Sequence, residues 1–89
     1  MAKIHATIWK YPLKVKDFQI IEMPAVSKVL RIEMQRGHVC MWVMVDPTTP
    51  KRKREILCFG TGHEVLATWD RFIGTVLVHD DEVYHYFFA

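Results

Sequence analysis

Alternation of apolar and polar residues with a period of two runs through most of this chain, and it constrains the fold more than any other feature. The alternating segments are rich in β-branched and aromatic residues and are separated by turn residues. This pattern predicts a mainly β fold, a compact antiparallel sheet or meander of about six to seven short strands. The expected strands span residues 4–10, 18–22, 28–35, 39–45, 54–59, 72–78 and 83–88.

Two features mark the limits of this strand pattern. In residues 64–71, Val65, Leu66 and Trp69 recur at helical spacing, which predicts either one short helix or an irregular arm. The prolines fall between the expected strands, where a missing N–H costs no hydrogen bond of a sheet. They are Pro12, Pro24, Pro47 and Pro50.

The length of the chain, 89 residues, suits a single β domain over residues 1–89. A domain of this size buries only about 60% of the surface that its extended chain exposes, so its core contributes little stability. The expected strand at residues 39–45 is apolar on both sides and needs cover on both. We therefore expect a homo-oligomer.

The clearest turn lies at Arg36-Gly37-His38, where Gly37 can adopt the positive φ of a tight hairpin. The loop takes either the first two or the last two of these residues, and both registers place Leu30, Ile32 and Met34 on one apolar face. The opposite face mixes charged and apolar side chains. It carries Arg31, Glu33 and Gln35 beside Cys40, Trp42 and Met44.

The charge balance and the apolar runs exclude some partners. Twelve Lys and Arg residues against ten Asp and Glu residues give a net charge of +2, which is too mild to indicate binding of a specific nucleic acid sequence. The longest apolar run, residues 39–45, is about a third of the length that spans a bilayer, and the N-terminus lacks the apolar stretch of a signal peptide. The two cysteines are far apart and do not form the dense disulfide framework of a small secreted domain. We therefore expect a cytoplasmic protein, and the short apolar runs predict that it contacts no membrane.

The segment Gly60-Thr61-Gly62-His63 follows an expected strand and is the first candidate binding site. Its glycines, Gly60 and Gly62, allow successive backbone N–H groups to converge on an anion, and Thr61 and His63 add a hydroxyl and an imidazole for a phosphate. The alternative is a plain exit from a strand, in which both glycines only supply positive φ.

Cations and tryptophans supply the other candidates. In the run from Lys51 to Arg54 the side chains alternate sides of an extended chain, so at most two of them address one ligand. The alternative for this run is a solvated loop tip that protects a sheet edge. We assign neutralisation of ligand charge to Arg31, Arg52 and Arg54, and stacking on a base to Trp42 or Trp69.

No set of residues indicates catalysis. Cys40 and Cys58 lie in apolar strands, where a buried thiol is unreactive, and the histidines lack the spacing of metal ligands. The acidic residues 80–82 form a turn tip, where nothing desolvates a carboxylate. We expect no catalytic residue, no bound metal and no cofactor.

Short motifs along nearly the whole chain carry a resemblance. They are Ile8-Trp9-Lys10-Tyr11, Glu22-Met23-Pro24, Val45-Asp46-Pro47, Gly60-Thr61-Gly62-His63 and Ile73-Gly74-Thr75. Together they resemble an uncharacterised family of small phage and prophage proteins, classified only as a domain of unknown function. The resemblance implies viral origin and a compact β domain, and it supplies no catalytic residues.

Small phage proteins without enzymatic motifs are frequently inhibitors of host defence. The expected function is therefore non-enzymatic: a homo-oligomeric anti-defence protein in the host cytoplasm that sequesters a small phosphorylated, nucleotide-like immune signal. The alternative is a protein–protein inhibitor of a host defence complex or a small virion assembly component, docking through the face that carries Trp42 or through a sheet edge. A hydrolase is the third option.

Overall fold

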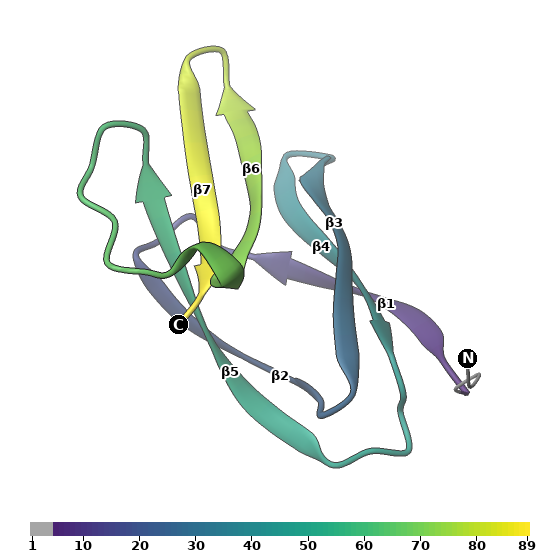
Figure 1. Ribbon diagram of the computed structural model, residues 1–89. Helices are drawn as coiled ribbons and strands as arrows, with labels where there is room; N and C mark the ends of the chain where they lie inside the picture. Colours follow the sequence, from purple (N-terminus) through teal and green to yellow (C-terminus); the bar gives the residue numbers. More distant parts are fainter. Residues whose placement is uncertain (1–4) are drawn as a thin grey trace.

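The computed structural model describes residues 5–89, and strands dominate this part of the chain (Figure 1). Within these residues there are seven strands and one short 3-10 turn. They are β1 (Thr7–Leu13), β2 (Phe18–Pro24), β3 (Ser27–Gln35), β4 (His38–Val45), β5 (Lys51–Gly60), η1 (Trp69–Arg71), β6 (Phe72–His79) and β7 (Glu82–Phe88). The mainly β, antiparallel class predicted from the alternation is confirmed. Ile4, the expected start of the first strand, lies outside the described residues.

The strands form two antiparallel sheets. The three-stranded sheet has the order β1-β4-β3, and the four-stranded sheet has the order β2-β5-β7-β6. The chain passes between the sheets twice at one corner, where Ala25 N–H donates to the Pro50 carbonyl at 2.7 Å and Asp46 N–H donates to the Val26 carbonyl at 2.9 Å. A long two-stranded ribbon therefore bends at this corner, with β3 and β4 in one sheet and β2 and β5 in the other (Figure 1).

The core lies between the facing sides of the two sheets. From β4 it takes Val39, Met41, Val43 and Val45, each at most 2% exposed, and from the four-stranded sheet it takes mainly Ile56, Cys58, Val76 and Tyr86. The sheets approach most closely where β3 crosses β6, because a Cβ at Gly74 would overlap Cγ2 of Ile32. Only glycine leaves room for that contact.

The β3–β4 hairpin selects one of the two expected registers. Gln35 pairs with His38, so the loop is Arg36-Gly37, with φ of 51° and 82° at its two residues. Two positive φ values are typical of the tight turn whose twist matches the strands. The expected place of Leu30 on the apolar face is wrong, because the register shifts between Val29 and Arg31 and Leu30 is 49% exposed.

The structure also decides between the alternatives for residues 64–71 and for the basic run, and it corrects the placement of two prolines. The short helix near residues 64–71 reduces to an irregular arm that ends in η1, since Leu66 and Trp69 are exposed and give a helix no buried face. Pro12 lies within β1 and Pro24 is the last residue of β2, so neither falls between strands; both are edge strands, which tolerate proline. The basic run from Lys51 to Arg54 belongs to β5 and pairs with β2, so it is not a loop tip.

Candidate functional site

The residues predicted to bind a ligand do not converge in one copy of the chain. Arg31 and Trp42 are cross-strand neighbours in the three-stranded sheet. Arg52 lies near the start of β5 and Gly60 at its end, roughly 26 Å apart at about 3.3 Å per residue. The sequence candidates therefore divide among at least three places: the outer face of the three-stranded sheet and the two ends of β5.

The Gly60–His63 segment forms a turn that its own contacts hold. The N–H of His63 donates to the Gly60 carbonyl at 3.2 Å, and its imidazole lies against Gly60. Of the two glycines only Gly62 has a positive φ, at 89°. One backbone N–H of the expected anion nest is thus already used inside the turn, and binding of an anion here stays a prediction.

His85 ties this turn to the sheet. Its Nε2 lies 2.8 Å from the Thr61 hydroxyl, and its Nδ1 lies 2.9 Å from the Thr75 hydroxyl. A hydroxyl can donate or accept, so both contacts are satisfied by either neutral form of the imidazole. Sequence reasoning missed this role because Thr61 and His85 are far apart in the chain, and the pairing of β5 with β7 that brings them close was not predicted.

A cleft of about 270 Å³ lies beside the turn, between the β1–β2 loop and the ends of β5 and β7. Lys16, Asp17, His63 and Tyr84 line it, together with Val15, Cys58 and Gly60. The nearby Glu82 carboxylate raises the pKa of Tyr84. Acidic and basic groups are thus mixed around this cleft, which favours no one sign of ligand charge.

The start of β5 holds an unusual cation. The Cζ atom of Arg54 lies 3.9 Å from the ring centroid of Phe88, so the guanidinium stacks on the ring. Burial and, second, the positive charge of Arg71 lower the pKa of Arg54. Among residues 5–89 the ion pair formed is that of Arg31 with Glu33, so no carboxylate lies at ion-pair distance from Arg54 or Arg71.

This cluster of Arg54, Arg71 and Phe88 combines expected and missed residues. Arg54 was a sequence candidate because it ends a basic run. Arg71 and Phe88 were missed, since each is an isolated residue that only the pairing of β5 with β7 and of β7 with β6 brings close. Arg52 shares a strand face with Arg54, whereas Trp69 stands two residues before Arg71 with 97% of its surface exposed.

The sequence profile of a domain of unknown function, DUF7352, matches residues 4–89. The chain belongs to this family. Searches of curated proteins and of solved structures gave no significant match. This match confirms the predicted membership in an uncharacterised family.

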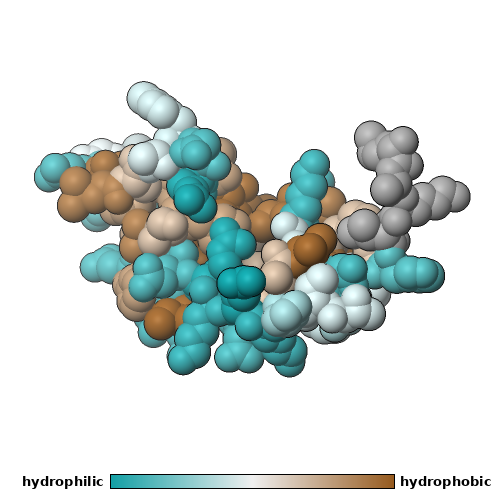
Figure 2. Space-filling view, turned by 60° about the horizontal axis from the view of Figure 1, so that its bottom comes forward, coloured by the Kyte–Doolittle hydropathy of each residue, from teal (hydrophilic) through white to brown (hydrophobic). Residues whose placement is uncertain are grey.

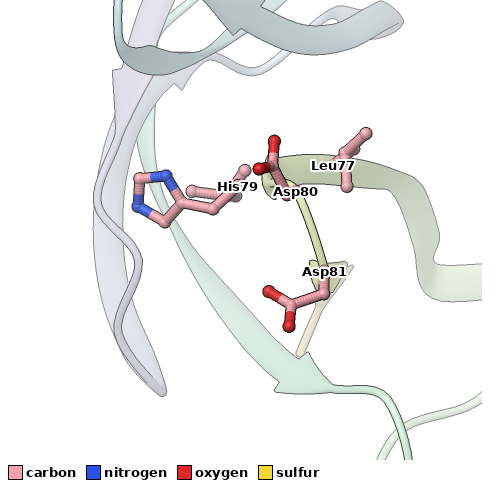
Figure 3. Close-up of a pocket in the computed structure, with 5 residues that line it drawn as sticks. Leu77, His79, Asp80 and Asp81 are labelled. Atoms are coloured by element: carbon pink, nitrogen blue, oxygen red, sulfur yellow. The ribbon is translucent and has the colours of Figure 1, made fainter.

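The tip of the β6–β7 hairpin forms a further hollow in this DUF7352 domain. This hollow of about 470 Å³ is lined by residues 77–81 alone, and Figure 3 shows Leu77 and His79 projecting from the turn in opposite directions.

Residues 5–89 contain no group of three or more potential metal ligands. None of their helical segments is long and apolar enough to cross a membrane.

Proposed function

We propose that this protein is a non-enzymatic binding protein that holds a small phosphorylated, nucleotide-like ligand on the guanidinium groups of Arg54 and Arg71. The observation that carries the proposal is the pair of neighbouring cations, Arg54 and Arg71, which form no ion pair among residues 5–89, although Asp70 lies close enough for the charge of Arg71, after the hydrogen bond from Thr68, to lower its pKa. Two like charges near a half-buried position repel each other and lose hydration, which costs free energy. A dianionic phosphate between them removes both costs.

The orientation of Arg54 suits such a ligand. The Cζ atom of Arg54 lies over the Phe88 ring, and among the described residues no carboxylate lies at ion-pair distance from its N–H donors. A planar fork of donors matches two oxygens of a phosphate. Trp69 supports the nucleotide-like part of the proposal, because its exposed indole offers a stacking surface for a base close to Arg71 in the chain.

The resemblance to phage and prophage proteins supplies the biological part of the proposal. A phage-encoded binder of this kind acts in the cytoplasm of the infected cell, where it captures a phosphorylated host immune signal and keeps that signal from its receptor. Capture without turnover requires only affinity, and Arg54 and Arg71 provide charge and geometry for it.

Isothermal titration calorimetry tests the proposal with three probes: a cyclic dinucleotide, ADP and inorganic phosphate. We expect binding of at least one probe, and Arg54→Ala should weaken it about ten- to a hundredfold, as loss of a charge-assisted bidentate contact does. Arg36→Ala, which removes a cation from the turn of the other sheet, is the matched control and should bind normally.

Two outcomes oppose the proposal in different ways. No binding of any probe, or unchanged affinity in a folded Arg54→Ala variant, removes the assigned site. Recovery of a hydrolysed probe after incubation, detected by mass spectrometry, contradicts the non-enzymatic part alone. Arg54→Lys keeps the charge and loses the planar fork, so an intermediate affinity is expected if the geometry matters.

A further inference from the structure

A row of apolar side chains crosses the outer face of the four-stranded sheet. Phe18 on β2 pairs with Leu57 on β5, Leu57 pairs with Phe87 on β7, and Phe87 pairs with Phe72 on β6. The rings of Phe72 and Phe87 lie 5.2 Å apart between centroids. Phe18 and Phe72 are 46% and 50% exposed, so the row is open to solvent at both ends.

The arm before β6 extends this row. A hollow of about 340 Å³ is lined by Phe87 together with Val65, Ala67, Thr68 and Trp69 of the arm. Trp69 is 97% exposed. We call the surface made by Phe18, Leu57, Phe87, Phe72, Val65 and Trp69 the aromatic face. In Figure 2, hydrophobic side chains gather at the left, on the side where the arm lies in Figure 1.

We infer that the aromatic face is the surface on which a second copy of this chain docks. Since aromatic side chains bury about 150–250 Å² each, this face and the adjacent Leu66 and Ile20 expose on the order of 600–800 Å² of apolar surface. A standard interface needs about 800 Å² from each partner, whereas a monomer seldom leaves a patch this large uncovered. The available area therefore matches what one side of a dimer contributes.

The charges around the aromatic face favour a second copy over an unrelated partner. On the outer face, Ile20 of β2 pairs with Glu55 of β5. Two residues further along β2, Glu22 pairs with Lys53. Asp70 flanks the other end, next to Trp69. A rim that carries both signs can be self-complementary under a twofold axis, because an acid of one copy can face Lys53 of the other.

Sedimentation equilibrium over a range of protein concentrations tests this inference. We expect the wild type to dimerise at roughly tens of micromolar, and Trp69→Ala to raise the dimer Kd at least about thirtyfold, as truncation of a central tryptophan does. Since Trp69 is 97% exposed in one copy, the monomer of this variant should unfold at the wild-type temperature. Ile8→Ala is the control, because Ile8 is 57% exposed on the other sheet and should not affect the dimer.

A wild type that stays monomeric at every concentration overturns the inference and leaves the aromatic face to a different protein. A dimer that survives Trp69→Ala but dissociates in Ile8→Ala overturns it as well, and assigns the interface to the three-stranded sheet. The sedimentation runs contain no nucleotide or phosphate, so ligand binding does not enter this test, although Trp69 belongs to both proposed surfaces. Arg54 and Phe88 lie on the opposite side of the four-stranded sheet, so Arg54→Ala should leave the dimer intact.

Discussion

The two sheets expose opposite kinds of outer face. On the three-stranded sheet, Lys10 of β1 donates to Gln35 of β3 at 2.9 Å across the central strand, and Arg31 pairs with Glu33 at 3.1 Å. Long polar side chains thus cover apolar residues such as Cys40, which points outward and is still only 4% exposed. On the four-stranded sheet the aromatic face has no such cover.

This difference teaches that apolar residues on the outside of a sheet are informative only together with their cross-strand neighbours. Trp42 is partly buried because Lys10 and Arg31 are its partners on either side. Trp69 has no polar partner of this kind and is almost fully exposed. Trp42 belongs to a face whose apolar side chains are already covered by polar ones, whereas Trp69 belongs to a surface that another molecule can cover.

The largest expected effect tests whether the two sheets share one core. Gly74→Ala should lower the free energy of unfolding by about 3 kcal/mol, because the new Cβ overlaps Ile32. Ile32→Ala alone should cost about 2 kcal/mol, and the double variant should be more stable than the sum of both costs predicts. Urea denaturation measures all three. Strictly additive costs would show that the sheets do not meet at this contact.

A second prediction contrasts the two tryptophans directly. Trp42→Ala should cost about 1–2 kcal/mol of folding stability, since it removes a partly buried ring, and should leave self-association unchanged. Trp69→Ala should show the reverse pattern. Urea midpoints and sedimentation on the same samples separate the two quantities. If both variants lose stability equally, the distinction between a covered face and an uncovered one fails.

A third prediction compares tyrosines from the two sheets under alkaline conditions. Burial raises the pKa of Tyr86 above its ordinary value of 10.0, so the folded protein keeps this proton at a pH where the unfolded chain loses it. The contribution of Tyr86 to stability should therefore be constant below pH 10 and then fall by about 1.4 kcal/mol per pH unit. Cys58, whose pKa burial also raises, acts in the same direction.

Tyr86→Phe should flatten this alkaline decline, measured as the urea midpoint between pH 8 and 11. Tyr11→Phe is the comparison from the three-stranded sheet. Burial raises the pKa of Tyr11 too, but Tyr11 is only partly buried, so its removal should flatten the decline less. An equal effect of both variants would mean that the two sheets exclude water from their tyrosines equally.

The smallest expected effect concerns the cover of the three-stranded sheet. Arg31 and Glu33 have side chains 67% and 54% exposed, and exposed ion pairs contribute little to stability. Replacing both with alanine should leave the urea midpoint nearly unchanged while uncovering Trp42. Weak new self-association in sedimentation would support the role of polar cover, and a large loss of stability would contradict it.

Local features of the fold were predictable because they depend on neighbouring residues. The position of Gly37 indicated the β3–β4 turn, and the alternation indicated which side chains of each strand share a face. The displacement of Leu30 was not predictable, because a bulge inserts one residue without any proline or glycine to mark it. Arg54 was a candidate from its basic run, but nothing near Arg71 or Phe88 in the sequence marks them as its neighbours.

The sequence by itself determined that this chain forms antiparallel strands, where most of them turn, and that its apolar content exceeds what one small core can hide. These properties follow from the period-two alternation of side chains and from the backbone conformations that turn residues allow, and both depend on only a few neighbouring residues. Only the tertiary structure decided that the strands divide into two sheets, that Arg54 lies near Arg71 over Phe88, and that one outer face is covered while the other is open. Those outcomes depend on which strands become neighbours. The alternation of apolar and polar residues in a strand does not specify its neighbour, because the same alternation suits any strand that it pairs with.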